Sequence, residues 1–266
     1  MKKFIAIALT LVMVLGLFAA CGNKTVEEAP VEEAAGLSTI EEGKLIMSTN
    51  AAFPPYEMTD DAGNFIGIDV EIAQAIAEKL GLELVIDNME FTAALEAAQQ
   101  GKSDMVMAGV TVNEDRLAVM DFSDSYATGI QVVIVKEGSD VTMDNLGEKM
   151  IGAQRGTTGY IYASDSIENG GYGEDHVIAY DNGITAVQAL MNGQIDAVII
   201  DNAPAQEFVD ANAGLTLLEG EWVVENYAIG FTKGNTALVE AVNGALAELI
   251  ADGTVQAIID KYIVAE

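Results

Sequence analysis

Residues 95–109 read LEAAQQGKSDMVMAG, and residues 187–201 read VQALMNGQIDAVIID. Aligned without a gap, each stretch has a helical run, a glycine, an aspartate and then a short apolar run. The glycine is typical of a helix C-cap, and the apolar run is typical of a buried strand. Gly109 and Asp201 fall opposite each other in this alignment, each just past a strand. The repeat predicts two similar helix–strand units; the alternative is a coincidental likeness between ordinary units of an α/β protein.

From residue 44 onward, predicted strands alternate with predicted helices. Repeated alternation of this kind predicts an α/β fold with mainly parallel sheets. Ligands of open α/β sheets bind past the carboxyl ends of the strands, so the repeat suggests two lobes that face one shared cleft. Strands are predicted over residues 45–49, 82–86, 105–107, 130–135, 150–153 and 197–200, and helices over residues 68–80, 92–100, 184–191, 203–211, 236–251 and 254–264.

The first 20 residues have the pattern of a secretory signal peptide. Lys2 and Lys3 precede an uncharged apolar stretch over residues 4–19, which suits a signal better than a membrane span. The stretch LFAAC at residues 17–21 resembles the lipobox of bacterial lipoproteins, in which the signal is cut before the cysteine and the cysteine carries lipid. We expect an extracytoplasmic protein, anchored to the cell membrane through Cys21, with an acidic tether over residues 21–38. The alternative is an ordinary signal peptide with an incidental cysteine.

Composition excludes several classes of function. The formal net charge of −30 argues against binding to nucleic acid, which requires a basic surface. Cys21 is the single cysteine and His176 the single histidine, so a disulfide within the chain, a zinc site and a Cys/His dyad have no support. No nucleophile elbow is present to complete a serine triad. We therefore expect no catalytic residue, no metal and no cofactor.

Polar residues near the predicted strand ends suit a zwitterion. Arg116 lies one turn into a predicted helix with Asn113 as its N-cap, and a guanidinium binds a carboxylate through two parallel hydrogen bonds. Asp201 would supply the opposite charge for an ammonium, and Thr111 a hydroxyl. The alternatives are an Arg116 that pairs with a neighbouring acid on the surface of a helix, and an Asp201 that caps the helix following it.

Residues 38–266 resemble a known family over nearly their whole length: the bacterial extracellular solute-binding proteins of family 3, which are the amino-acid receptors of ABC importers. Each motif is weak alone, but their order and spacing together are specific. The motifs are STNAAFPPYE at residues 48–57, GIDVE at 67–71, AGVT at 108–111 leading to Arg116, MDFSD at 120–124, GTT at 156–158, and DAV at 196–198 leading to Asp201.

The resemblance implies a two-lobed, periplasmic-binding-protein-like (type II) fold with a hinge and a cleft between the lobes. Lobe 1 would comprise residues 39–128 and, after the chain returns, residues 225–266. Lobe 2 would comprise residues 129–224. The chain would cross between the lobes near residues 128–131 and 222–227.

The resemblance also implies a binding site. Arg116 would hold the α-carboxylate of an amino acid, with help from Thr111 and Thr158. Asp201 and the carbonyl of Gly109 would take the α-ammonium. Further site residues at matching positions are Phe53 and Phe91, which would flank the ligand side chain, and Asn50, Gln154 and Thr157.

Ligand preference follows from neutral amides in the implied pocket. Asn50 and Gln154 suit a polar, uncharged side chain better than a cationic one, so we expect a neutral polar amino acid in preference to a basic one. Glu57 or Glu90 would reverse this preference if either reached the pocket. The expected partners are a polar amino acid and a membrane ABC permease, with the protein acting as a monomer. The alternatives are a surface sensor that binds a ligand, and an enzyme similar to cyclohexadienyl dehydratases, with Glu57 or Glu90 as its general acid.

Overall fold

The computed structural model describes residues 37–220 and 222–263. The predicted signal peptide, Cys21 and the tether as far as residue 36 lie outside the described residues. Within the described part, no helix has the length and apolarity needed to cross a membrane.

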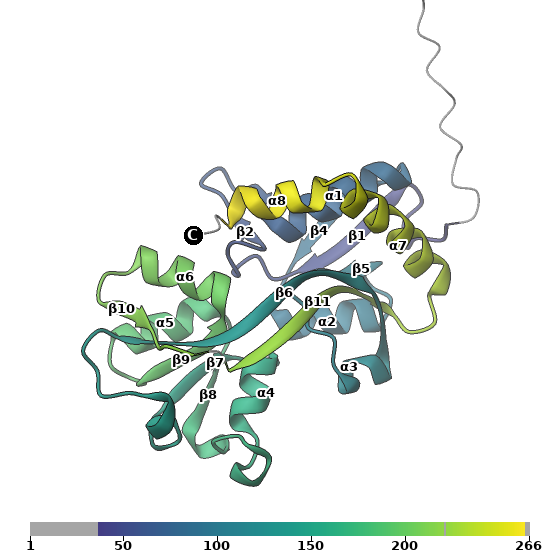
Figure 1. The fold of residues 1–266 in the computed structure, drawn as a ribbon. Helices are drawn as coiled ribbons and strands as arrows, with labels where there is room; N and C mark the ends of the chain where they lie inside the picture. The colour runs from purple at the N-terminus through teal and green to yellow at the C-terminus, as the bar shows by residue number, and fades with distance from the viewer. Residues whose placement is uncertain (1–36, 221, 264–266) are drawn as a thin grey trace, which may run out of the picture. The chain divides into compact units, whose positions relative to one another are not determined.

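One large mixed sheet organises the described chain (Figure 1). Its strands run in the order β4-β1-β5-β11-β6-β9-β7-β8, and β10 pairs with β6 beside this row. A small hairpin, β2 (Met58–Thr59) with β3 (Phe65–Ile66), is separate. The strands of the large sheet are β1 (Lys44–Thr49), β4 (Glu83–Asn88), β5 (Met105–Val106), β6 (Met120–Lys136), β7 (Ile151–Gln154), β8 (Val177–Tyr180), β9 (Ala197–Asp201), β10 (Leu215–Leu217) and β11 (Val223–Thr232).

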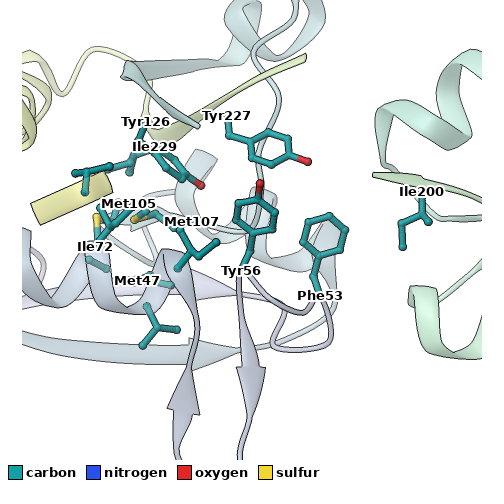
Figure 2. Close-up of a cluster of buried hydrophobic side chains, with 14 of the residues drawn as sticks. Met47, Phe53, Tyr56, Ile72, Met105, Met107, Tyr126, Ile200, Tyr227 and Ile229 are labelled. Carbon is teal, nitrogen blue, oxygen red and sulfur yellow. The ribbon is translucent and has the colours of Figure 1, made fainter. Parts of the chain in front are cut away.

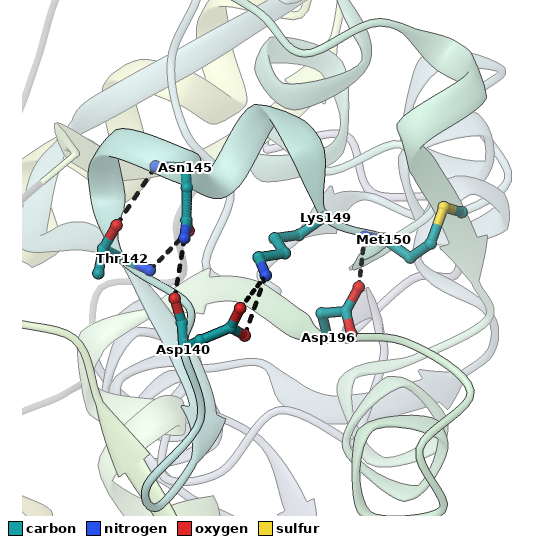
Figure 3. Close-up of polar contacts among 6 residues, drawn as sticks. All are labelled: Asp140, Thr142, Asn145, Lys149, Met150 and Asp196. Carbon is teal, nitrogen blue, oxygen red and sulfur yellow. Dashed lines mark hydrogen bonds and ion pairs between the residues drawn. The ribbon is translucent and has the colours of Figure 1, made fainter.

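The two ends of the sheet have the same topology, which confirms the predicted repeat. β1 pairs in parallel with β4 and β5, and β7 pairs in parallel with β8 and β9. The aspartate of each repeat has the same structural role. Asp104 accepts the backbone N–H of Ile46 in β1 at 2.7 Å, and Asp196 accepts that of Met150, just before β7, at 2.8 Å (Figure 3). Each carboxylate thus fixes the start of the third strand against the first strand of its own unit.

Helices pack on the sheet largely as the sequence predicted. Asn113 caps α3, accepting the N–H of Arg116 at 2.8 Å. The last two helices, α7 and α8, return to pack against α1 at the top of Figure 1. The helices are α1 (Ile68–Leu80), α2 (Phe91–Gln99), α3 (Glu114–Val119), α4 (Thr158–Ser164), α5 (Gly183–Met191), α6 (Asn202–Ala211), α7 (Thr236–Ala251) and α8 (Thr254–Tyr262), with short 3₁₀ helices η1 (Met143–Glu148), η2 (Ile167–Asn169) and η3 (Glu174–His176).

The middle of the sheet departs from the prediction of mainly parallel pairing. β6 and β11 form a long antiparallel pair, and β6 begins at Met120, well before the strand predicted over residues 130–135. Polar residues in its first half, such as Ser123 and Asp124, hide this strand from a search for apolar runs. β6 goes on to pair with β9, while β11 goes on to pair with β5. The two segments predicted as chain crossings therefore lie side by side, with Thr128 opposite Asn226.

A cluster of buried hydrophobic side chains includes Phe53, Tyr56 and Tyr227 (Figure 2). Tyr56 and Tyr227 are fully or almost fully buried and meet edge to face, with ring centroids 5.1 Å apart. Phe53 stacks on Tyr56 at 5.8 Å. Aromatic pairs of this geometry add about 1 kcal/mol to the free energy gained from burial. Phe53 also lines a pocket, so this aromatic cluster supports part of the pocket wall.

Candidate functional site

A single pocket brings together residues from both ends of the sheet. All the side chains predicted to bind a ligand line it, together with Glu57 and Ala108. The predicted lining residues are Asn50, Phe53, Phe91, Gly109, Thr111, Arg116, Gln154, Thr157, Thr158 and Asp201. The structure thus places all ten predicted residues in the wall of one pocket.

Strand ends position these residues. Asn50 follows β1, Gly109 follows β5, and Gln154 ends β7. Asp201 is the last residue of β9, and Thr158 is the first of α4. Within each unit, the parallel strands bring their carboxyl ends to the same edge. The two units run in opposite directions on either side of β11 and β6, and the carboxyl ends of both contribute polar groups to one cavity.

Arg116 is a buried cation at this pocket. Its side chain is 7% exposed, and its guanidinium donates to the carbonyls of Thr111 at 2.8 Å and Gly156 at 3.1 Å. The guanidinium also lies over the ring of Phe91, 5.5 Å from its centroid. No carboxylate lies within ion-pair distance among residues 37–220 and 222–263, so the surface-pair alternative is wrong. Burial lowers the pKa of Arg116, and the charge of Glu225 partly offsets this shift.

Asp201 is a buried carboxylate held from two sides. It accepts from the hydroxyl of Tyr227 and, at 2.9 Å, from Nε2 of Gln131. Asp201 occupies the N-cap position of α6, as the alternative predicted, but its side chain makes no capping hydrogen bond and lines the pocket. Gly129 leaves room for this arrangement, since a Cβ there would overlap the Tyr227 hydroxyl. Burial raises the pKa of Asp201 to about 6.

Gly109 requires glycine for two reasons. Its φ of +55° is in the left-handed region, and a Cβ would lie 2.8 Å from the ring of Phe53. Its N–H donates to Asp69 at 2.9 Å, and Asp69 also accepts from the hydroxyl of Tyr126 at 2.7 Å. Burial raises the pKa of Asp69 to about 6. These bonds fix the strand end that carries the Gly109 carbonyl.

Glu57 is the acid that sequence analysis left undecided. It is fully buried, it lines the pocket, and neither of its carboxyl oxygens has a hydrogen-bond partner in the described chain. Burial, followed by the charge of Asp69, raises its pKa well above the ordinary value. Glu90 is exposed at the start of α2 and does not line the pocket. The position of Glu57 inside a motif of family type was the sequence signal that pointed to it.

The side-chain amides of Asn50 and Gln154 are hydrogen-bonded to each other. Gln154 donates from Nε2 to Oδ1 of Asn50 at 2.9 Å, and Asn50 donates from Nδ2 to the carbonyl of Met89 at 2.8 Å. Their pairing leaves Glu57 as the lining side chain with unmet hydrogen-bonding capacity on both oxygens.

Sequence analysis missed Glu225 and Gln131. Glu225, in β11, is buried behind Thr111 and Thr158, and its Oε2 accepts hydrogen bonds from both threonine hydroxyls and from Gln131. Neither residue lies at the end of a parallel strand, so no motif singled them out. Only the pairing of β6 with β11 brings them to the pocket.

Stability is expected to rise as the pH falls from 7.5 to 5. Asp69 and Asp201 have folded-state pKa values of about 6, against 3.8 when unperturbed, so the native state binds more protons than the unfolded chain between these values. The contribution of each carboxyl group to the free energy of unfolding is complete below pH 3.8 and is lost as the pH rises through 6. This contribution is on the order of 3 kcal/mol per group. Melting temperatures measured across this range by circular dichroism check the prediction.

The control for this experiment is a variant with Asp69→Asn and Asp201→Asn together. Protonation also relieves general charge repulsion, which the variant retains, so its melting temperature should change less with pH than that of the wild type. Carboxylates with lowered pKa, such as Asp121, stay ionised above pH 5 and do not interfere. A wild-type melting temperature that is constant or falls towards pH 5 would contradict the assignment.

Comparisons with known proteins identify the family of this chain. Residues 45–265 match the bacterial extracellular solute-binding proteins, family 3. The L-cystine-binding protein TcyJ of Escherichia coli is 32% identical over 230 residues, covering 85% of each chain. The ABC transporter glutamine-binding protein GlnH of Bacillus subtilis is 30% identical over 272 residues, covering 99% of this chain and 98% of that protein.

A solved structure shows the same fold. An ancestral arginine-binding protein bound to glutamine matches with a TM-score of 0.78 at 36% identity, over 85% of this chain and 100% of that chain. This likeness confirms the predicted type II periplasmic-binding-protein fold. The chain belongs to the bacterial extracellular solute-binding proteins, family 3, which confirms the prediction that it is a binding protein and not an enzyme.

Proposed function

We propose that this protein is the substrate-binding component of an amino-acid ABC importer, and that it binds a free L-amino acid and delivers it to a membrane permease. The relatives reported above bind cystine, glutamine or arginine according to their names. The single observation that carries the proposal is a pocket with a buried, unneutralised Arg116 and a buried Asp201 in its walls. Such a pair is complementary to a zwitterion.

The α-carboxylate is assigned to Arg116. Its guanidinium has more N–H donors than its two carbonyl bonds use, so some can meet a ligand carboxylate. Thr111 adds a backbone donor. Hydrogen bonds to β11 flank it on either side, from Ala228 to Val110 and from Val112 to Asn226, so the N–H of Thr111 points away from that strand.

The α-ammonium is assigned to Asp201 and the carbonyl of Gly109. Both groups lie in the wall of the same pocket. Asp201 accepts a hydrogen bond from the buried hydroxyl of Tyr227. The N–H of Gly109 donates to Asp69, which in turn accepts from the buried hydroxyl of Tyr126. An ammonium beside Asp201 would offset the burial that raises the pKa of this carboxyl. Ligand binding is therefore expected to keep Asp201 ionised.

The ligand side chain is assigned to the space between Phe53 and Phe91, with Glu57 as its polar contact. An unpartnered carboxylate in a buried site is costly unless a donor meets it. We therefore propose a polar amino acid whose side chain donates hydrogen bonds. This assignment changes the preference expected from Asn50 and Gln154 alone: because Glu57 reaches the pocket, a basic side chain is favoured over a neutral one.

A thermal-shift screen tests the proposed function. The protein, stripped of ligand by unfolding and refolding, is measured with each of the twenty amino acids, cystine and ornithine. A ligand present at a hundred times its Kd adds about 2.7 kcal/mol, which corresponds to a shift of roughly 5 °C or more in a protein of this size. We expect such a shift with one or a few polar L-amino acids, arginine or lysine foremost. A melting temperature that no amino acid changes would refute the proposal.

Replacing Glu57 with glutamine is expected to reduce the preference for a basic ligand. The variant keeps the shape of the side chain and loses its ability to carry charge, so the ratio of the affinity for L-arginine to that for L-glutamine should fall about 10-fold. Calorimetric titration with both amino acids measures this ratio. Glu90→Gln is the matched control, because Glu90 is exposed outside the pocket. An unchanged ratio in the Glu57 variant would remove Glu57 from the side-chain subsite.

Closure of two lobes around the ligand is part of the proposal. We propose lobe 1 over residues 39–128 and 225–266, and lobe 2 over residues 129–224. The hinge would be the antiparallel pair of β6 and β11, since those strands alone among the elements of the described sheet run from one repeat unit to the other. Contacts from both lobes to one ligand would favour the closed state. Small-angle scattering with and without ligand tests this, and an unchanged radius of gyration would exclude closure.

Attachment to the cell membrane through Cys21 is a further part of the proposal, supported by the lipobox-like sequence at residues 17–21. A lipid anchor would keep the protein near its permease despite a net charge of −30, which anionic lipid would repel. Mass spectrometry of the mature N-terminal peptide tests it. A peptide that begins elsewhere, or an unmodified Cys21, would refute the anchor.

A further inference from the structure

Glu225 is a buried carboxylate to which two of the three threonines lining the pocket, Thr111 and Thr158, donate hydrogen bonds. Its Oε2 lies 3.2 Å from the hydroxyl of Thr111 and 2.8 Å from that of Thr158. The same oxygen accepts from Nε2 of Gln131 at 2.9 Å, so it is the common acceptor of three donors. The hydrogens of both hydroxyls therefore point towards Glu225.

Each threonine then faces the pocket as an acceptor. A hydroxyl has one hydrogen and two lone pairs, and its hydrogen is used once it donates to Glu225. Thr111 and Thr158 line the pocket, whereas Glu225 does not. Glu225 thus sets, from behind the pocket wall, which hydrogen-bonding role the two hydroxyls show to a ligand.

Gln131 ties this arrangement to Asp201. Its Nε2 donates to Oε2 of Glu225 and to Oδ2 of Asp201, both at 2.9 Å. Asp201 and the two hydroxyls are therefore linked through Gln131 and Glu225, and Asp201, Thr111 and Thr158 all line the pocket. All three offer acceptors to it, and a group with several N–H donors satisfies them best.

We propose that Glu225 is a positioning residue that makes the pocket select an α-ammonium over an α-hydroxyl. This inference rests on the proposed function of amino-acid binding. An ammonium brings three donors, whereas an α-hydroxy acid brings one and leaves buried acceptors unpaired. A binding site that pairs its buried acceptors with a ligand donor strongly rejects an analogue without that donor, because the acceptors are then buried without hydrogen bonds.

The test compares L-arginine with argininic acid, its α-hydroxy analogue, and L-glutamine with its own α-hydroxy analogue, by calorimetric titration. For whichever amino acid binds, the wild type should prefer it over its analogue at least 100-fold. Glu225→Met removes the acceptor and should lower this preference 10-fold or more, since both hydroxyls become free to donate into the pocket.

Glu225→Gln is the matched control. It retains an oxygen that accepts, and its amide nitrogen replaces Oε1, which has no hydrogen-bond partner in the described chain. Its preference should stay within about 3-fold of the wild type.

A second variant separates positioning from a general structural effect. Thr158→Val removes one hydroxyl and should lower the preference in the wild-type background. In the Glu225→Met background it should have little further effect, because the two residues act through the same hydrogen bond. The single Thr158 variant also serves as the test if Glu225→Met does not fold.

The outcomes separate this inference from the proposed function. A wild-type protein that binds no amino acid overturns the proposed function and the inference with it. A wild-type protein that binds its amino acid, but whose preference is the same after Glu225→Met or Thr158→Val, overturns the inference alone. Equal losses in the Glu225→Gln and Glu225→Met variants would also overturn it, since they would assign the effect to charge and not to hydroxyl orientation.

Discussion

Replacing Arg116 with alanine is expected to lower the affinity for the amino-acid ligand about 1,000-fold, or about 4 kcal/mol. The variant removes the buried cation of the pocket, and a ligand carboxylate would then be desolvated without a charged donor. It also removes the bonds from Arg116 to the carbonyls of Thr111 and Gly156, which join segments from the two repeat units at the pocket. Calorimetric titration of the refolded variant measures the loss.

Arg155 provides a matched control for this variant. It follows the pocket residue Gln154 in the sequence, but its side chain is exposed and does not line the pocket. Arg155→Ala should bind within about 2-fold of the wild type. Arg116→Lys keeps the charge but loses the planar donor pair, and an affinity loss of about 100-fold is expected. Binding by a folded Arg116→Ala variant at near wild-type affinity would contradict the carboxylate assignment.

Replacing Asp201 with asparagine is expected to lower the affinity at pH 7.5 about 100-fold. Asparagine has nearly the same shape, and its oxygen can still accept from Tyr227 or Gln131, but it has no charge to pair with a ligand ammonium. The wild-type affinity should fall as the pH drops below about 6, where free Asp201 becomes protonated, whereas the affinity of the variant should stay nearly constant.

Glu207 gives the control for the Asp201 variant. It is an exposed acid on α6, the helix that Asp201 precedes, so Glu207→Gln removes one negative charge from the same region outside the pocket. Its affinity should match that of the wild type at each pH. An Asp201→Asn variant with the wild-type pH profile would show that another group binds the ammonium.

Much of the site was predictable because it lies where strands end. Gly109 and Asp201 occupy equivalent places in the sequence repeat, and the structure puts each at the carboxyl end of a strand in its own unit, in the wall of one pocket. Arg116 was predictable because a capped helix follows one of these strand ends. Local patterns of apolar residues and caps set these positions, so a single sequence carries them.

The missing parts depend on long-range pairing. β6 was predicted too short because its first half is polar, and Glu225 reaches Thr111 and Thr158 only because β11 pairs along β6. The burial of Glu57 depends in the same way on packing beside Asp69, which comes from the start of α1. A local sequence pattern encodes neither the register of the antiparallel pair β6 and β11 nor the burial of one acidic side chain such as Glu57. For that reason the sequence predicted a neutral ligand, whereas the burial of Glu57 led us to propose a ligand side chain that donates hydrogen bonds to it.

A crystal structure of the refolded protein with the tightest-binding amino acid of the thermal-shift screen tests the central claim most directly. The account predicts the α-carboxylate on the guanidinium of Arg116 and the α-ammonium within hydrogen-bond distance of Asp201, with the side chain between Phe53 and Phe91. An amino acid bound in the reverse orientation, or bound outside the pocket that these residues line, would contradict it.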